Sequence, residues 1–320
     1  PIPDKNGLMA SKYLIDQVNK LGKNDLLIFL VSGGGSSLLP APPNGFNLED
    51  EINLNQKLIH SGMTIHETNL IRKHFSIIKG GRLARIAYPS KINTYVVSDI
   101  PGDDLSQVSS GPTLPSIGKS SDAINCINKY AINLPKKILN HIKNSNSDTP
   151  SIKDKIFKNN NSYLLASAKK SMNATYNLAK LMDFEAIIIS DQSQGYAIDL
   201  AKEHSNFIKN YIKKNNKKNT SKKLCFFSGG ETSVKVKNLK GKGGRNTEYL
   251  LSLAIQFELL KINSFVAISA DTDGIDGTEN NAGAIIDENT LFKIRSKRLS
   301  PEKILFENNS YKAFEASGEL

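Results

Sequence analysis

Small, hydroxylic or acidic residues follow directly after short apolar runs at four places in this sequence. The four junctions contain Ser32–Ser37, Asp99, Glu231 and Asp271. Short, nearly continuous apolar runs are typical of strands in parallel sheets buried on both faces, and ligands bind at the carboxyl ends of such strands. Glycine lets the backbone approach a ligand, while Ser, Asp and Glu oxygens contact phosphate groups or hard cations. The pattern predicts an enzyme that acts on an anionic, phosphorylated substrate.

The first junction is a serine-rich glycine loop that can present several N–H groups to an oxyanion. It lacks the dinucleotide fingerprint, because Leu38 stands where the third glycine of G-x-G-x-x-G would fall. It is not a P-loop either, because no Lys-Ser or Lys-Thr pair follows. A tight strand-to-helix turn is the alternative. We favour substrate or phosphate binding by the loop residues Ser32, Gly33, Gly34, Gly35 and Ser36.

Two further glycine turns carry cations. One contains Lys79 and Arg82, and the other contains Gly243, Gly244, Arg245 and Asn246. Phosphoryl transfer depends on positioning and charge neutralisation, so an arginine on a glycine-rich turn at a helix start is suited to it. We predict that Arg245 is catalytic and that the other five residues bind substrate or phosphate. An exposed helix-capping loop is the alternative.

The acidic residues at the strand ends predict a cation site. Asp99, Glu231 and Asp271 are the candidate metal ligands. Asp271, Asp273 and Asp276 form a D-x-D-x-x-D pattern without the glutamate of an EF-hand, so magnesium or ribose contact fits better than calcium. His66 and His74 lie on a predicted amphipathic helix and are expected to be packed or solvated.

The elements that must position these residues alternate between strands and helices. We predict helices near 8–21, 51–61, 65–74, 120–132, 168–182, 195–213 and 246–260, and strands at the four apolar runs, at 163–166 and at 186–189. This rhythm predicts an α/β protein with two Rossmann-like α/β domains and a cleft between them. The domains are expected at residues 1–150 and 151–320, with a polar linker over 143–162. The Ser32–Ser37 loop and Arg245 are expected to face one shared concavity in that cleft.

Composition restricts the partners and the compartment. The net charge is +11, but the lysines are dispersed or sit in tracts such as 213–218 without interleaved aromatics, so we predict a solvated surface and no nucleic-acid partner. No apolar run reaches the roughly 18 residues of a membrane span, and no membrane association is predicted. Cys126 and Cys225 are far apart, which favours free thiols in the cytoplasm. The oligomeric state stays open, with a homodimer as one alternative.

Six motifs, in order along nearly the whole chain, resemble the glycerate 2-kinase family. The family is also called the MOFRL family, and its members were formerly named hydroxypyruvate reductases. The motifs are SGGGSSLL at 32–39, ETNLIRKHFSIIKGGRLA at 67–84, SDIPGDDLSQVSSGPTLP at 98–115, SGGETSVKV at 228–236, GKGGRNTEYLLSLA at 241–254 and DTDGIDGTENNAGA at 271–284.

The resemblance implies transfer of the ATP γ-phosphoryl group to the 2-hydroxyl of D-glycerate with Mg²⁺ or another divalent cation. It also implies a glycerate kinase N-terminal domain followed by a MOFRL domain, with the active site between them. Arg245 matches one of two residues that the family uses for phosphoryl transfer. The other is a lysine in a segment upstream of the part that Pro1–Asp4 resembles.

The sequence departs from the family at its ends and at three positions. The family continues beyond the last residues of this chain, so we expect a fragment whose activity is impaired and whose sheet or core is exposed. Tyr196, Thr247 and Asn309 replace the usual Glu, Gln and Asp. A hydroxypyruvate-reducing oxidoreductase and a non-catalytic binding module remain the alternatives, and the missing dinucleotide fingerprint counts against the oxidoreductase.

Overall fold

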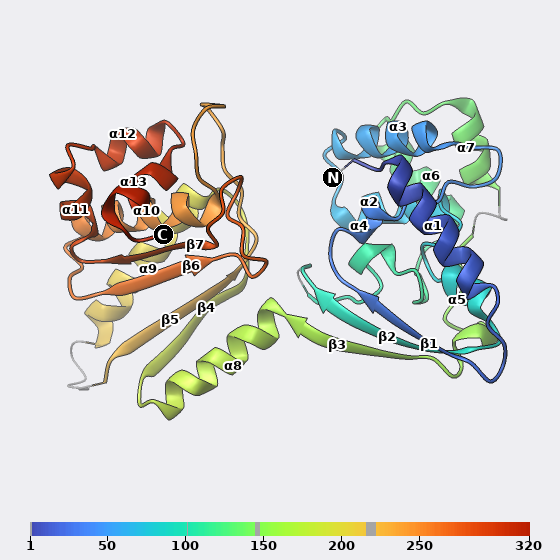
Figure 1. Ribbon diagram of the computed structural model, residues 1–320, viewed down its shortest axis with the longest axis horizontal. Helices are drawn as coiled ribbons and strands as arrows, with labels where there is room; N and C mark the ends of the chain where they lie inside the picture. Colours follow the sequence, from blue (N-terminus) through green and yellow to red (C-terminus); the bar gives the residue numbers. More distant parts are fainter. Residues whose placement is uncertain (1, 101, 145–147, 216–221) are drawn as a thin grey trace. The chain divides into compact units, whose positions relative to one another are not determined.

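The computed structural model describes residues 2–100, 102–144, 148–215 and 222–320 (Figure 1). Pro1 and Pro101, and residues 216–218 of the lysine tract, belong to the sequence features above but lie outside the described residues. The chain divides into two compact units, Pro1–Ala168 and Lys169–Leu320. The mixed α/β class with parallel sheets is confirmed, and each unit is described below by itself.

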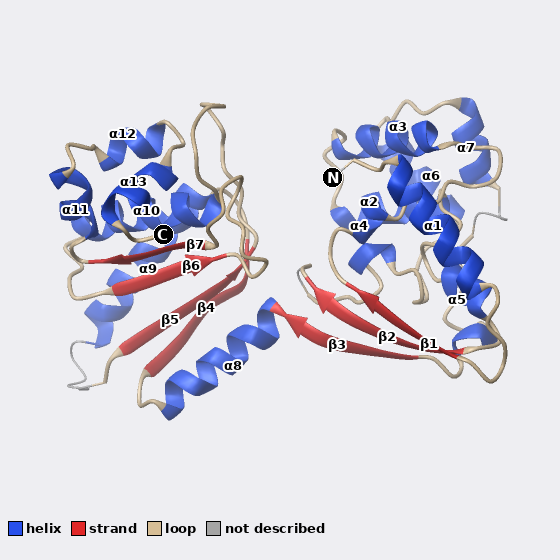
Figure 2. Ribbon diagram, viewed as in Figure 1, coloured by secondary structure: helices blue, strands red, loops and turns tan. Residues whose placement is uncertain are grey.

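The sheet of the first unit contains three parallel strands in the order β1 (Leu26–Val31), β2 (Lys91–Ser98) and β3 (Asn161–Ser167). Helices α1 (Lys5–Val18) and α5 (Arg82–Ala87) cover one face (Figure 2). Phe29 and Ile92 from this face are buried in one cluster with Val18 and Leu83. Because successive strand residues point to opposite faces, only alternate residues of β1 reach these helices.

The other face of this sheet is exposed, so the prediction of burial on both faces is wrong here. Leu26, Ile28 and Leu30 of β1 are 50%, 59% and 72% exposed. On β2 and β3, Tyr95 and Tyr163 pair in register and stack with ring centroids 5.0 Å apart. Within the described part of this unit, helices therefore cover only one face of β1, although the residues on both of its faces are apolar.

A cluster of helices completes the first unit. It contains α3 (Leu48–Ile59), α4 (Ile65–His74), α6 (Ser120–Lys129) and α7 (Lys136–Lys143) around Leu54, Ile71, Phe75, Ile127 and Ile138. Helix α4 begins with the capping box that the Thr64 and Glu67 spacing indicates. Glu67 N–H donates to Thr64 Oγ1 at 3.3 Å, and Thr64 N–H donates to Glu67 Oε2 at 3.0 Å. Three one-turn segments join these elements: α2 (Gly35–Leu38), η1 (Val108–Ser110) and η3 (Lys155–Phe157).

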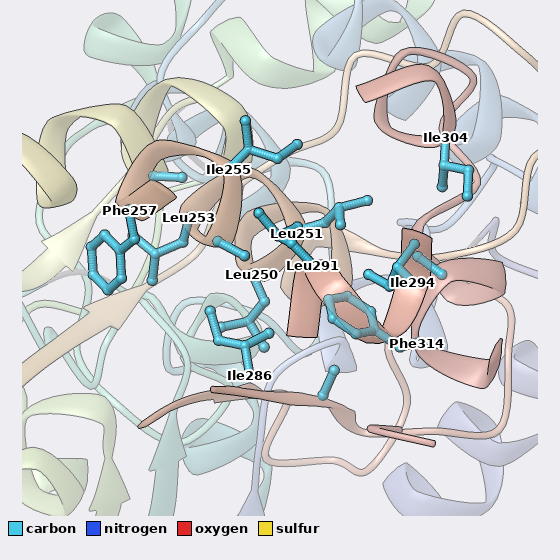
Figure 3. Close-up of a cluster of buried hydrophobic side chains, with 14 of the residues drawn as sticks. Leu250, Leu251, Leu253, Ile255, Phe257, Ile286, Leu291, Ile294, Ile304 and Phe314 are labelled. Atoms are coloured by element: carbon cyan, nitrogen blue, oxygen red, sulfur yellow. The ribbon is translucent and has the colours of Figure 1, made fainter. Parts of the chain in front are cut away.

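The second unit is built around helix α10 (Arg245–Leu259). Figure 3 shows Leu250 and Leu251 of this helix among Ile286, Leu291, Ile294 and Phe314 in the main apolar cluster. The other helices are α8 (Ala168–Leu181), α9 (Ala197–Asn215), α11 (Thr290–Ser296), α12 (Pro301–Phe306) and α13 (Ser310–Ser317). The strands are β4 (Glu185–Ser193), β5 (Leu224–Gly230), β6 (Val266–Ala270) and β7 (Gly283–Asp287).

Strand β6 corrects the expectation that all four apolar runs lie in parallel sheets. Strands β4 and β5 are parallel, but β6 pairs antiparallel with β7, and Val266 faces Asp287. Parallel neighbours need a crossover, usually a helix, whereas the segment 271–282 between β6 and β7 contains no helix and turns back. The acidic motif of this segment is therefore the connection of a hairpin.

The division between the units follows from the pairing of β3. Its pairing with β2 places residues 161–167 in the first unit, and the division comes at the start of α8. The domain assignment over residues 1–150 and 151–320 stays a prediction, as does the cleft between the domains.

Lys73 of α4 is an unusual interior cation. Its side chain is 2% exposed, and no hydrogen bond or ion pair of its ammonium joins it to any described residue. Burial lowers the pKa of Lys73 to about 8, against a smaller opposing effect of Asp104. In the unfolded chain the pKa of Lys73 is near 10.5. Between pH 8 and pH 10.5 the unfolded chain therefore binds more protons than the folded chain. Stability attributable to Lys73 rises with pH across this window.

We predict that Lys73→Met stabilises the protein at pH 7 by about 2–3 kcal/mol, because it keeps the apolar stem and removes the buried charge. The advantage over wild type should shrink from pH 8 upward and vanish above pH 10.5. Urea unfolding of both proteins at a series of pH values measures the difference. A gain that is the same at every pH would show that the charge of Lys73 has no part in it.

Candidate active site

The glycine loop of the first unit lies at the carboxyl ends of β1 and β2, as expected. It begins directly after β1, and Gly34 adopts φ 82°, which favours glycine. A side chain on Gly33 would collide with the carboxylate of Asp99, and one on Gly35 would collide with the Ser109 side chain. The outer glycines therefore let the loop pack against the neighbouring strand end. The loop and Asp99 are brought together, while their ligand-binding roles stay predictions.

A second turn, missed at the sequence level, locks this loop in place. Ser109 and Ser110 have φ 50° and 60°, a conformation that costs non-glycine residues energy and that tends to cluster at functional sites. Ser109 Oγ donates to the Ser32 carbonyl at 2.6 Å. Ser110 Oγ lies 2.8 Å from Ser36 Oγ and donates to Asn69 Oδ1 at 3.2 Å. The Ser-Ser-Gly triplet inside the third motif was the available signal.

The Lys79–Arg82 turn is hydrogen-bonded to the same Ser109–Ser110 turn. Its backbone N–H groups at Gly80 and Gly81 donate to the carbonyls of Ser110 and Gly111 at 2.9 and 2.8 Å. Lys79 Nζ pairs with Glu51 Oε1 at 2.9 Å, and both side chains are buried. Arg82 Nη1 donates to two backbone carbonyls, and burial lowers the pKa of Arg82 to about 10. Both cations are engaged inside the fold, and their phosphate-binding roles stay predictions.

In the second unit, Arg245 lies between two carboxylates at the start of α10. Arg245 Nε and Nη2 approach Asp271 at 3.2 and 2.7 Å, and Nη1 donates to Glu231 Oε1 at 2.7 Å. These interactions, with Asp271 first, raise the pKa of Arg245 further above its usual value. Asn246 Nδ2 also donates to Asp271 at 2.9 Å. The guanidinium is therefore charged and fixed in direction.

Asp276 holds the helix end from which Arg245 extends. Its Oδ1 accepts from Asn246 N–H and its Oδ2 from Thr247 N–H, both at 2.9 Å. Thr247 Oγ1 donates to Oδ2 as well, at 2.8 Å, and Asp276 is fully buried. A side chain on Gly244 would occupy the position of Asp276. Asp276 is thus an N-terminal cap supplied by the hairpin loop, and its oxygens are not available to magnesium or ribose.

A pocket of about 530 Å³ lies beside this helix end. Arg245, Asp271, Gly243 and Gly244 contribute to its wall. The rest of the wall combines apolar and polar side chains, including Val234, Val236, Leu239, Ile275, Glu248 and Asn308. Pockets of this volume are the usual size of small-molecule sites, and polar side chains form much of this wall. The predicted residues Arg245, Gly243, Gly244 and Asp271 therefore share one cavity.

The three candidate metal ligands are divided between the units. Asp99 belongs to the first unit, and Glu231 and Asp271 belong to the second. No group of three His, Cys, Asp or Glu residues within the described ranges is arranged to hold a metal ion. Glu231 and Asp271 converge on a guanidinium, so the cation between them here is Arg245.

A buried histidine network also lies at the ends of β4 and β5. His204 Nδ1 lies 2.8 Å from Tyr249 Oη, and Ser228 Oγ lies 2.9 Å from Ser193 Oγ. Burial lowers the pKa of His204, so the imidazole is held neutral. Nothing in the spacing of the sequence indicated this network, because its members come from four elements.

Known proteins resemble the chain over its whole length. The model named domain of unknown function (DUF4147) matches residues 1–143, and the MOFRL family model matches residues 224–320. A D-glycerate 2-kinase of Thermotoga maritima is 36% identical over 323 residues, which cover all of this chain and 74% of that protein. The crystal structure of the Thermotoga maritima glycerate kinase superposes with a TM-score of 0.84 at 35% identity, covering 100% of this chain and 74% of that one.

The chain belongs to the glycerate 2-kinase family. The resemblance seen in the six motifs is thereby confirmed. A relative of Agrobacterium vitis, 38% identical over 321 residues that cover 100% of this chain and 81% of that protein, carries the name putative hydroxypyruvate reductase. The matched MOFRL region contains Glu231, Arg245, Asp271 and Asp276, so the whole Arg245 arrangement lies inside it. The glycine loop and Asp99 lie inside the other matched region.

We predict that Asp276→Ala destabilises the second unit by about 2–3 kcal/mol, because two N–H groups in the first turn of α10 lose a charged acceptor. Asp273→Asn, in the same loop, is the matched control. Asp273 is exposed and accepts only from Ile275 N–H among the described residues, a bond that asparagine can reproduce. Thermal and urea unfolding compare the two variants. Equal stability in both would contradict the cap assigned to Asp276.

Proposed function

We propose that this protein is an ATP-dependent glycerate 2-kinase that transfers the γ-phosphoryl group to the 2-hydroxyl of D-glycerate. The products are ADP and 2-phosphoglycerate, and the hydroxyl proton is released. The observation that carries the proposal is Arg245, which is fixed at a helix start on the wall of a ligand-sized pocket. The family to which the chain belongs supports the same reaction.

In this proposal Arg245 neutralises the charge on the transferred phosphoryl group. The chemistry of phosphoryl transfer leaves little covalent work for the protein, so a directed guanidinium is among the largest contributions that a side chain can make. Asp271 fixes its direction through Nε and Nη2, and Asn246 steadies Asp271 in turn. Val234, Val236 and Leu239 add apolar surface to the pocket wall, against which the nucleotide would pack.

The first unit is proposed to bind glycerate through the Ser32–Ser36 loop. Ser110 positions the Ser36 hydroxyl, Ser109 holds the Ser32 carbonyl, and the loop backbone carries no side chain at three successive glycines. Lys79 and Arg82 stay predicted phosphate contacts, on a turn whose Gly80 and Gly81 N–H groups donate to Ser110 and Gly111. The shared concavity that would join this loop to Arg245 is part of the proposal.

We propose that Mg²⁺ or another divalent cation accompanies ATP. Glu231 and Asp271 both pair with Arg245 here, so no step in this proposal depends on a metal at that place. Asp99, Glu231 and Asp271 stay predicted ligands.

ATP and D-glycerate are the proposed partners, without nucleic acid or membrane and with a homodimer left open. None of the described helices has both the length and the apolar character of a membrane span. The cytoplasm stays the proposed location, where Cys126 and Cys225 are expected to be free thiols.

The function is tested with protein expressed from its full open reading frame. We expect ADP formation from ATP only when D-glycerate and Mg²⁺ are present, with the phosphate on the 2-hydroxyl of the product. Phosphorus NMR identifies the product, and a coupled assay measures ADP. Oxidation of NADH with hydroxypyruvate, without glycerate-dependent ADP, would favour the oxidoreductase alternative.

Arg245→Ala is expected to lower kcat by about a thousandfold, because the transition state loses its neutralising cation. Arg245→Lys should recover little, since an ammonium cannot approach a phosphoryl group and Asp271 together with the planar fork of arginine. Circular dichroism of both variants controls for folding. Turnover close to that of wild type in Arg245→Ala would limit Arg245 to a structural role.

A further inference from the structure

The two carboxylates that hold Arg245 differ in how firmly they are fixed. Asp271 is 15% exposed, contacts Nε and Nη2 of Arg245, and is also bound by Asn246 Nδ2. Glu231 is 67% exposed and makes one side-chain hydrogen bond among the described residues, to Arg245 Nη1. An exposed single ion pair contributes little to stability, whereas a partly buried two-point pair is much harder to break. Glu231 is therefore the displaceable partner.

The local charge balance opposes binding of an anion. One guanidinium faces two carboxylates, so the arrangement as a whole is negative. A phosphoryl group that approaches Arg245 meets Glu231 on the side where Nη1 points. A like charge at such a distance reduces affinity, and the donor that the phosphate needs is already occupied.

The backbone around Glu231 allows its side chain to leave. Gly229 and Gly230 precede it, and Gly230 adopts φ 142° at a position where the Ser193 backbone leaves no room for a side chain. Glu231 N–H donates to the Ser193 carbonyl at 2.9 Å, so the backbone is fixed although the carboxylate is exposed. Rotation of the side chain into solvent breaks one hydrogen bond and moves no strand.

We propose that Glu231 is an internal anion that occupies the phosphate position on Arg245 and is displaced when the phosphoryl group binds, while Asp271 remains as the anchor. The ligand class is a phosphate or polyphosphate, and the site is Arg245 Nη1 with the adjoining pocket. Glu231 is thus a positioning residue that holds Arg245 Nη1 until substrate arrives, beside the pocket whose wall includes Arg245 and Asp271. The inference takes the phosphoryl ligand from the proposed function, but its test needs neither glycerate nor turnover.

The test measures binding of pyrophosphate by isothermal titration calorimetry in the presence of EDTA. Glu231→Gln keeps the size and the acceptor oxygen but removes the charge. We expect it to bind pyrophosphate about fivefold more tightly than wild type, which corresponds to the loss of one exposed competing ion pair. Asp271→Asn should bind more weakly, because the guanidinium loses its anchor.

Glu279→Gln is the matched control, since it removes one negative charge from a neighbouring ion pair, with Lys242, and does not contact Arg245. Its pyrophosphate affinity should stay within about twofold of wild type. As a second measurement, the Arg245 Nε–H NMR signal should persist when pyrophosphate is added, while the Nη signals shift.

Unchanged or weaker binding by Glu231→Gln in EDTA would overturn the inference. So would a variant that loses Mn²⁺ affinity without any gain for metal-free pyrophosphate, which would make Glu231 a metal ligand instead. Tighter binding by Glu231→Gln in a protein without glycerate-dependent ADP formation would support the inference and reject the kinase. The two proposals can therefore fail separately.

Discussion

The buried carboxylate of Asp276 is the interaction on which the second unit's site depends. It replaces the side-chain cap that Gly244 cannot provide and satisfies two N–H groups of α10. A buried carboxylate is tolerated only when its oxygens are fully hydrogen-bonded, and here the positive helix end adds to the stabilisation. Because the same turn of α10 carries Arg245, the cap also fixes the backbone position from which the Arg245 side chain extends. The hairpin loop thus fixes both the helix and the acid that faces Arg245.

In the first unit, backbone geometry rather than a buried carboxylate positions the candidate site residues. Three turns meet there, and each requires glycine or a left-handed serine for close approach. The Gly33 and Gly35 positions face Asp99 and Ser109, and Gly80 donates to Ser110. Lys79 and Glu51 form a buried ion pair at this turn, and the desolvation of both charges offsets much of their attraction. Such an arrangement is better explained by positioning than by stability.

Much of the fold could be predicted from periodicity, because long amphipathic segments such as α4 and α10 carry strong helical signals. Local chemistry was equally visible, as in the capping box at Thr64. The antiparallel pairing of β6 could not be predicted, because the apolar run gives no direction for its partner. The resemblance implied an exposed sheet or core, but the residues of β1 could not identify the bare face, since Leu26, Ile28 and Leu30 are as apolar as the residues that are buried. Both depend on contacts between distant segments.

The site shows the same limit for acidic residues. Glu231, Asp271 and Asp276 all follow strands or lie in an acidic motif, so residue type alone suggests cation binding for each. The structure distributes them into an exposed single ion pair, a partly buried two-point pair and a helix cap, according to exposure and to the number of N–H groups each accepts. A carboxylate binds whichever positive group the fold brings nearest, whether a guanidinium, a helix end or a metal ion. An acidic motif at a strand end therefore predicts where positive charge is needed, but not which group supplies it.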